Sequence, residues 1–230
     1  MIQQSDTRTT TSNPPQGTTN LPWSDHYRAL LRRLKSVQTG AGDSPRLIGV
    51  TSCARGEGVS TVTVNLARHA AVDLGEHTLV VDLSTTQSSL AGILGGHVTT
   101  GLSDMLLQGA EPSECIRKAP IGNVAVLGIG SLKNELSASL DRNQVSELFA
   151  ELKSAYQFVV VDLPTASSLS GCFDFAGFLD GILLVVEAER VRGQVAQHVK
   201  AQLIKADANM LGVIFNKRRQ YVPNWLYRRL

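Results

Sequence analysis

Short apolar runs and amphipathic segments alternate along most of this 230-residue chain. Continuous runs of valine, isoleucine and leucine predict strands that are covered on both faces, as in a parallel sheet. The predicted strands span 46–51, 77–83, 123–128, 157–162, 181–187 and 210–216. Helical spacing of apolar residues predicts helices over 60–74, 102–108, 112–117, 141–155 and 191–206. This alternation predicts an α/β fold with a doubly wound, mostly parallel sheet in a single domain.

The two ends of the chain differ from this central pattern. Residues 1–22 are rich in Thr, Ser, Pro and Gln, a composition typical of a disordered tail. Residues 23–39 place apolar side chains on one face and arginines on the other, which predicts a helical N-terminal arm. Residues 45–217 form the predicted domain, and 218–230 form a basic, aromatic C-terminal tail. Such a tail either docks on a membrane-protein partner or folds back on its own domain.

Composition limits the classes of function. The chain is 43% hydrophobic and 18% charged, with a net charge of +2, which is too small to indicate nucleic-acid binding. Three scattered cysteines form no Cys-x-x-Cys pair, which fits a reducing compartment and provides no zinc site. The N-terminus has no signal-peptide pattern, and no apolar run is long enough to span a membrane. We therefore expect a cytoplasmic protein.

A glycine-bearing loop lies between the first predicted strand and the first helix of the domain. This arrangement directs backbone N–H groups and the positive end of a helix dipole at one point, which suits a phosphate. The candidate nucleotide-binding residues are Arg55, Gly56, Glu57, Gly58, Val59, Ser60 and Thr61. The usual motif has a lysine where this chain has Val59, whereas the metal-binding hydroxyl is retained as Ser60. The predicted cofactor is ATP or ADP with Mg²⁺.

Polar side chains end three of the predicted strands. Asp82 and Asp162 follow runs of valine, and parallel strands would bring both to the same edge as the loop. They are the candidate catalytic residues and, with Ser60, the candidate Mg²⁺ ligands. Asn216 ends the last strand, where its amide either reads an adenine edge or caps the turn.

With these motifs in this order, the chain resembles the bacterial tyrosine kinases of capsule and exopolysaccharide biosynthesis, relatives of the MinD/ParA-type ATPases. The segments that carry the resemblance are 51–52, 56–61, 65–67, 79–82, 101–106, 158–164, 180–185 and 211–216. The resemblance implies a P-loop NTPase-like domain with accessory-motif Asp82, Walker B Asp162 and adenine-reading Asn216. It also implies an inner-membrane polysaccharide co-polymerase as partner, and hence peripheral attachment to the inner membrane.

Three positions near the loop depart from the family pattern. The family lysine is Val59, the second aspartate of the accessory motif is Ser84, and the loop proline is Arg55. Losing one charge-assisted contact to a transition state costs about 3 kcal/mol or more. We therefore expect a chain that binds nucleotide with weak or no phosphotransfer and regulates the co-polymerase.

Self-assembly and phosphorylation motifs are also reduced. The family's oligomerisation motif survives as Asp25 and Arg28, with Arg32 one residue beyond its last position. The resemblance therefore implies a possible homo-oligomer formed through this helix. The tyrosine cluster is reduced to Tyr221 and Tyr227.

Two alternatives remain open from the sequence. The first is an active ATP-dependent protein-tyrosine autokinase in which the Arg55 guanidinium replaces the missing lysine. In the opposite reading, Arg55 points to solvent or to a neighbouring subunit. The second alternative is a MinD/ParA-like positioning ATPase, whose signature lysine would fall at Ala54.

Overall fold

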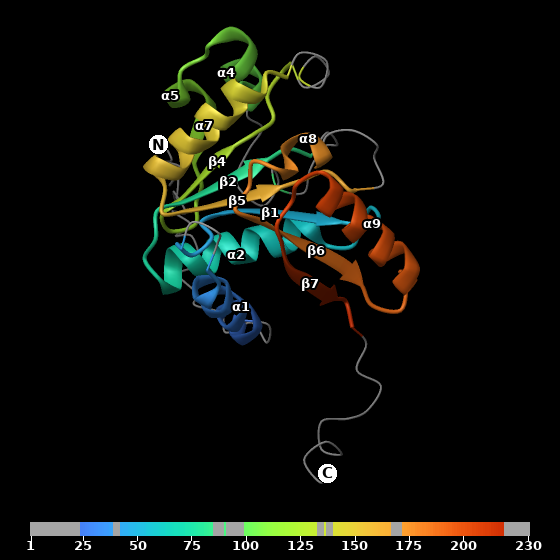
Figure 1. The fold of residues 1–230 in the computed structure, drawn as a ribbon. Coiled ribbons are helices and arrows are strands. Elements are labelled where there is room, and N and C mark those ends of the chain that lie inside the picture. The colour runs from blue at the N-terminus through green and yellow to red at the C-terminus, as the bar shows by residue number, and fades with distance from the viewer. Residues whose placement is uncertain are drawn as a thin grey trace, which may run out of the picture.

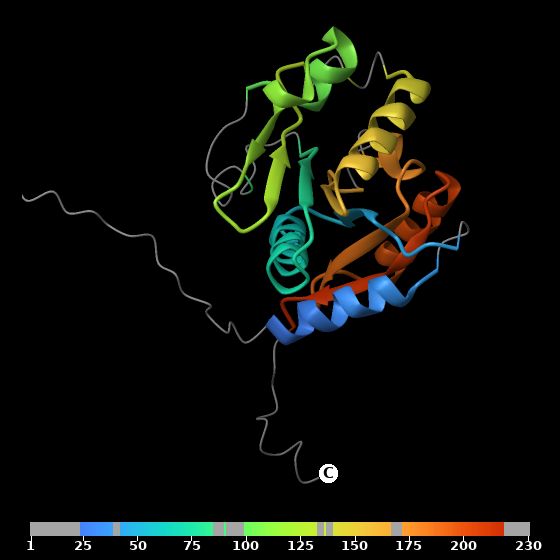
Figure 2. The same cartoon turned by 90° about the vertical axis from the view of Figure 1, so that its left-hand side faces the viewer.

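Seven strands form one sheet in the order β3-β4-β2-β5-β1-β6-β7, with helices on both faces (Figures 1 and 2). The computed structural model describes residues 24–38, 42–84, 90, 99–132, 136, 140–166 and 172–218. The strands are β1 (Leu47–Ser52), β2 (Thr78–Asp82), β3 (Ile116–Lys118), β4 (Val124–Leu127), β5 (Phe158–Asp162), β6 (Gly181–Glu187) and β7 (Met210–Asn216). All neighbouring pairs are parallel except β3 with β4. The predicted α/β class and mostly parallel sheet are confirmed.

The helices divide between the two faces of the sheet. They are α1 (Ser24–Ser36), α2 (Val59–Asp73), α4 (Leu102–Gln108), α5 (Pro112–Cys115), α7 (Arg142–Ala155), α8 (Cys172–Ala176) and α9 (Gly193–Lys205). Helices α1 and α2 share a core cluster with one face of β1, β5 and β6. Helices α4, α7, α8 and α9 contribute to the cluster on the other face.

The valine-rich strands are buried because both of their faces are covered. Along β5, Phe158 and Val160 belong to the cluster beneath α1 and α2, whereas Val159 and Val161 belong to the opposite cluster. All four side chains are fully buried. Alternate residues therefore enter different cores, which explains why these strands read as continuous apolar runs.

The segment predicted as a helix over 112–117 is the main error in the expected elements. Helix α5 ends at Cys115, and Ile116 takes an extended conformation (φ −95°, ψ 130°). From there β3 pairs antiparallel with β4, placing Ile116 opposite Leu127. A four-residue helix is marginal, and β-branched Ile116 gains more from pairing at the sheet edge. The short helix α8 was not predicted.

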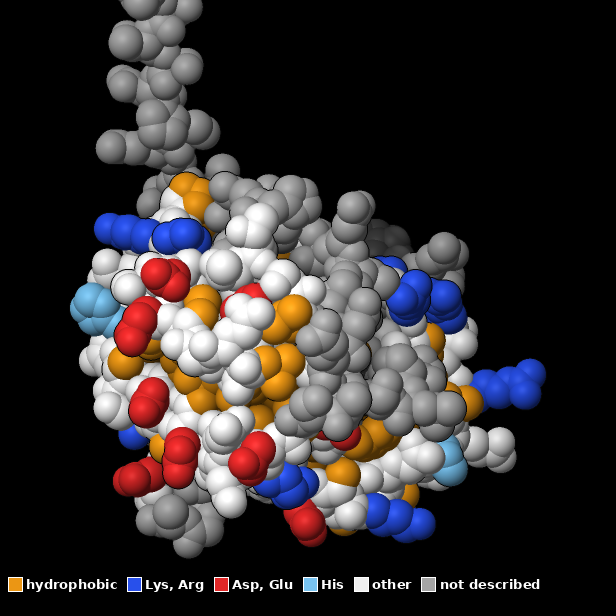
Figure 3. Space-filling model, turned by 90° about the horizontal axis from the view of Figure 1, so that it is seen from above, with side chains coloured by type: hydrophobic (Ala, Val, Ile, Leu, Met, Phe, Trp, Pro, Cys, Tyr) orange, Lys and Arg blue, Asp and Glu red, His pale blue; other side chains and the backbone are white. Residues whose placement is uncertain are grey.

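The outer surface carries both signs of charge. Seen from above, acidic and basic side chains surround apolar groups that remain visible between them (Figure 3). Within the described ranges, no helix is both long enough and apolar enough to cross a membrane. The predicted tails, 1–22 and all of 218–230 except Arg218, lie outside the described residues.

Candidate functional site

The loop after β1 has the shape expected of a phosphate-binding loop. Gly56 and Gly58 have φ values of 83° and 99°, in the left-handed region that favours glycine. A Cβ on Gly58 would lie 2.2 Å from Nδ2 of Asn216, so a side chain does not fit there. Helix α2 starts at once, with the Val62 N–H donating to the Gly58 carbonyl at 3.0 Å. The N-terminus of a fifteen-residue helix therefore points at the loop.

Val59 is turned toward the protein interior. Its partly buried side chain packs against the cluster that includes Leu31, Leu34 and Val62. The position from which an ordinary P-loop extends an ammonium group therefore borders the apolar core. Val59 can therefore contribute only its backbone groups to a phosphate site.

The two strand-end aspartates lie side by side. Asp82 on β2 and Asp162 on β5 are register partners, and Asp162 is also opposite Val50 on β1. The Leu83 N–H donates to the Asp162 carbonyl at 2.9 Å. The Asp82 carboxylate accepts from the Ser84 N–H at 3.0 Å. The sequence correctly predicted that both strands end at one edge, next to the strand that leads into the loop.

Asp162 is buried in a way that suits a bound cation. Its side chain is 2% exposed, and burial raises its pKa from 3.8 to about 7. A hydrogen bond from Ser60 opposes this shift, and the charge of Asp82 adds to it. Among the described residues, Asp162 Oδ2 has no hydrogen-bond partner. Mg²⁺ prefers carboxylate and hydroxyl oxygens, so Ser60, Asp82 and Asp162 fit this ion.

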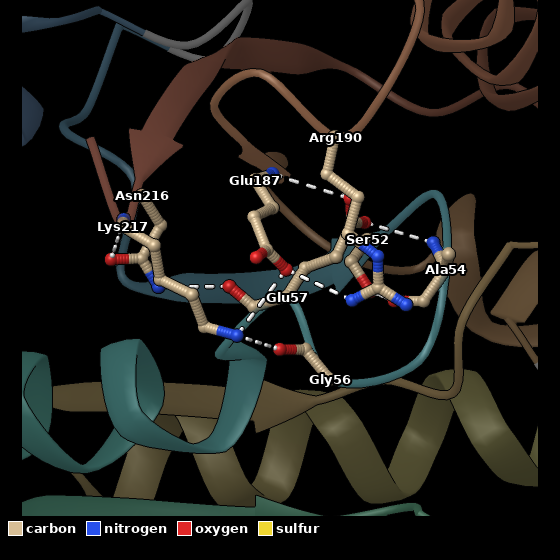
Figure 4. Close-up of polar contacts among 8 residues, drawn as sticks. All are labelled: Ser52, Ala54, Gly56, Glu57, Glu187, Arg190, Asn216 and Lys217. Carbon is tan, nitrogen blue, oxygen red and sulfur yellow. Dashed lines mark hydrogen bonds and ion pairs between the residues drawn. The ribbon is translucent and has the colours of Figure 1, made fainter. Parts of the chain in front are cut away.

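Glu57 ties the loop to the end of the neighbouring strand β6 (Figure 4). Its side chain is fully buried, and its carboxylate accepts from the Ala54 N–H at 2.8 Å and the Glu187 N–H at 3.2 Å. The first bond closes the loop on itself and the second ties it to the end of β6. The Glu57 carboxylate is thus engaged by the protein's own backbone.

Asn216 is fixed against the same loop. Its Nδ2 donates to the Glu57 carbonyl at 2.8 Å, and its Oδ1 accepts from the Lys217 N–H at 2.9 Å. An amide has two N–H donors and two acceptor positions on its oxygen. One N–H donor and one acceptor position of the Asn216 amide therefore remain for a hydrogen bond to a base, while the other two hold the loop and the following turn.

The other candidates for nucleotide binding differ in exposure. Arg55 is exposed on the loop, Ser60 is partly buried, and the Thr61 side chain is exposed. The Thr61 carbonyl accepts from Asn65 within α2 at 2.8 Å. Thr61 therefore lies on the outer surface of α2, and Ser60 is the hydroxyl that reaches Asp162.

Sequence reasoning missed three charged residues beside the loop. Glu187 ends β6, Arg190 follows it in the next turn, and Lys217 follows β7. The Lys217 ammonium donates to the Gly56 carbonyl at 2.5 Å and pairs with the Glu187 carboxylate at 3.2 Å. In the sequence, Lys217 directly follows Asn216 and precedes Arg218 and Arg219, so it resembles the start of a run of basic residues.

Two of the three α1 residues expected to support self-assembly, Asp25 and Arg28, have partners within this chain. Arg28 pairs with Asp73 of α2 at 2.8 Å and lies 3.6 Å from Asp25. His69 also contacts Asp73, at 2.6 Å. Arg32 is exposed.

A parallel sheet with a phosphate-type loop after β1 and aspartates ending two neighbouring strands defines a P-loop nucleotide-binding fold. The septum site-determining protein MinD of Pyrococcus horikoshii OT3, solved in complex with Mg-ADP, is similar at a TM-score of 0.63 and 26% identity. That comparison covers 80% of this chain and 76% of MinD. The chimerical protein CapA2B2 gives a TM-score of 0.74 at 26% identity, covering 88% of each chain.

Sequence comparison points to one branch of this class. The chain is 25% identical over 186 residues to tyrosine-protein kinase CpsD of Streptococcus agalactiae serotype III, covering 80% of each protein. It is 29% identical over 194 residues to the succinoglycan biosynthesis transport protein ExoP of Rhizobium meliloti, covering 80% of this chain but 24% of ExoP. No known family profile matches. The chain is homologous to the bacterial tyrosine kinases of capsule and exopolysaccharide biosynthesis, which confirms the predicted resemblance.

Proposed function

We propose that this chain is a nucleotide-binding component of exopolysaccharide or capsule assembly that performs little or no phosphotransfer. The observation that carries the proposal is the edge of the sheet where the loop lies near Asp82 and Asp162 while the Val59 side chain packs against the apolar core. The phosphate cradle and the acidic ligands are retained. The principal cation of the motif is absent.

Binding in this proposal relies on backbone groups and oxygen ligands. The loop amides and the α2 dipole receive the phosphates, and the Asn216 amide faces the base. Ser60, Asp82 and Asp162 hold Mg²⁺, which when bound neutralises charge on the terminal phosphates. The buried, partnerless Oδ2 of Asp162 supports this role.

Chemistry is weakened at the residues that would act on the γ-phosphate. A lysine at position 59 would place a full positive charge there, and one such contact corresponds to a rate factor of roughly a hundred to a thousand. A second carboxylate at position 84 would add metal or base chemistry, but Ser84 has only a hydroxyl. Nucleotide binding can therefore persist after phosphotransfer has been lost.

The direct test is incubation of purified protein with ATP and Mg²⁺, followed by mass spectrometry of the intact chain and of its peptides. We expect phosphotyrosine far below one per chain. Asp162→Ala is the background control, and Val59→Lys tests whether restoring the cation raises phosphorylation. Stoichiometric phosphate on Tyr221 or Tyr227 of the unmodified protein would contradict the proposal. Loss of that signal in Arg55→Met would then establish the autokinase alternative.

The proposed setting is the cytoplasmic face of the inner membrane, beneath a polysaccharide co-polymerase. The homology to kinases of capsule systems supports this partner, and the aromatic, basic residues 218–230 are the proposed contact. We expect deletion of 221–230 to abolish co-purification with the co-polymerase while the melting temperature changes little. Retained co-purification, or a large loss of stability, would instead favour a tail that folds back on the domain.

Self-assembly through α1 is a further part of the proposal. It requires Arg28 to exchange its internal partner Asp73 for a neighbouring subunit. Light scattering of the purified chain with and without nucleotide measures this, and a monomer under both conditions would contradict it.

A further inference from the structure

Two consecutive residues at the end of β7 hold two consecutive carbonyls of the phosphate loop (Figure 4). Asn216 Nδ2 donates to the Glu57 carbonyl at 2.8 Å, and Lys217 Nζ donates to the Gly56 carbonyl at 2.5 Å. These pairs are 159 and 161 residues apart in sequence. The sheet edge farthest from β3 thus reaches back to fix the loop.

The backbone of Lys217 is shaped for this contact. Its φ of 53° lies in the left-handed region, which a non-glycine residue adopts at a cost. The hydrogen bond from the Lys217 N–H to Oδ1 of Asn216 stabilises the turn. The chain turns at Lys217, and the Lys217 side chain lies over the loop.

A second cation lies at the same place. The Glu187 carboxylate pairs with Lys217 at 3.2 Å and with Arg190 at 2.9 Å. The Arg190 guanidinium would lie 3.8 Å from a Cβ on Gly56. Glu187 is therefore shared by two cations beside the loop, while the Glu57 carboxylate lies buried within the loop itself. Both cations are about half exposed, at 47% and 55%, so they are accessible to a ligand.

We infer that Lys217 is the positioning residue that replaces the missing P-loop lysine: it holds the loop in its binding shape and supplies positive charge to the bound purine nucleotide. The inference rests on the proposed function, since it deepens the description of the same site. It differs from rescue by Arg55 because Lys217 already contacts the loop backbone. Charge near a polyphosphate favours binding even from the side of the loop, since the phosphates carry several negative charges.

The test is calorimetric titration of the full chain with ADP and Mg²⁺, comparing the unmodified protein with single variants. We expect Lys217→Met to weaken binding about tenfold and Lys217→Arg to recover most of the loss. Lys200→Met should change affinity less than about threefold. Lys200 is an exposed lysine of α9 and is the matched control. Equal affinity of Lys217→Met and the unmodified protein would overturn the inference.

A measurement made without nucleotide tests this inference independently of the proposed function. Hydrogen–deuterium exchange of the amides from Cys53 to Gly58 should be faster in Lys217→Met than in the unmodified protein, with an unchanged melting temperature. Unchanged exchange would overturn the bracing role even if affinity fell. If the unmodified protein bound no nucleotide, the proposed function would fail, whereas faster loop exchange would still establish the brace.

Discussion

Two single residues define the candidate site: Val59 stands where the usual motif has a lysine, and Asp162 retains the carboxylate at the end of β5. Val59 packs against the core cluster beneath α1, so this position supplies no cation to the loop. Asp162 keeps a carboxylate where burial strongly opposes its charge. Burying such a group costs stability, and we propose that a cation binds there and offsets this cost.

The pH dependence of stability tests this view of Asp162. Its pKa in the folded protein is about 7 against an ordinary 3.8, so the folded state holds its proton more tightly than the unfolded chain. This group's contribution to stability is therefore fully present below about pH 4 and is lost as the pH rises through about 7. Without Mg²⁺, we expect the unmodified protein to lose on the order of 3 kcal/mol relative to Asp162→Asn between those pH values.

Urea unfolding of both proteins across this pH range measures the difference. Parallel pH curves for the two would contradict a raised pKa at Asp162. Added Mg²⁺ should reduce the difference at pH 8, because the ion favours the ionised carboxylate.

At the scale of elements, apolar patterning predicted six of the seven strands to within a residue or two. Strands β1, β2, β5 and β6 are covered on both faces, so all their residues except Asp82 and Glu187 are buried and the apolar runs are continuous. Strand β3 was missed because it has three residues at an edge and a pattern of Ile-Arg-Lys, which carries no such signal. Its structure depends on β4 being available as a partner.

The site was predictable for the same reason, and only in part. Consecutive strand ends meet at one edge in a parallel sheet, so the proximity of the loop, Asp82 and Asp162 followed from the sequence. The brace from Lys217 did not, because it depends on β7 lying two strands from β1 and on a left-handed turn at one lysine. The burial of Glu57 could not be predicted either, because a glutamate in a glycine-containing loop is usually exposed to solvent.

Helix α1 provides a test of packing at this scale. Leu31 and Leu34 are nearly fully buried in the cluster shared with α2 and the sheet, whereas Arg28 pairs with Asp73 at the surface. Removing buried leucine atoms costs about 2–5 kcal/mol, and a surface ion pair contributes at most about 1 kcal/mol. We expect Leu34→Ala to lower the free energy of unfolding by at least about 2 kcal/mol, and Arg28→Ala by less than about 1 kcal/mol.

Denaturant unfolding of the two variants decides between packing and charge as the force that holds α1. A larger effect from Arg28→Ala would show that the ion pairs with α2 dominate. Such a result would also make release of α1 for self-assembly more costly than the structure indicates.

For the whole molecule, the fold and the homology relate the chain to the capsule and exopolysaccharide kinases, while its loop has Val59 where the usual motif has a lysine. A P-loop fold that binds nucleotide without turning it over can still couple occupancy to assembly, because a ligand shifts an equilibrium by its differential affinity for two states. The central claim is therefore binding, and turnover is secondary.

Calorimetric titration of the unmodified protein with ADP and with ATP, each with and without Mg²⁺, tests that claim most directly. We predict binding of both nucleotides with dissociation constants between about 1 μM and 1 mM. We also predict that ATP binds more tightly with Mg²⁺ and that Asp162→Ala removes this dependence on the metal. No detectable binding of either nucleotide at millimolar concentration would contradict the account.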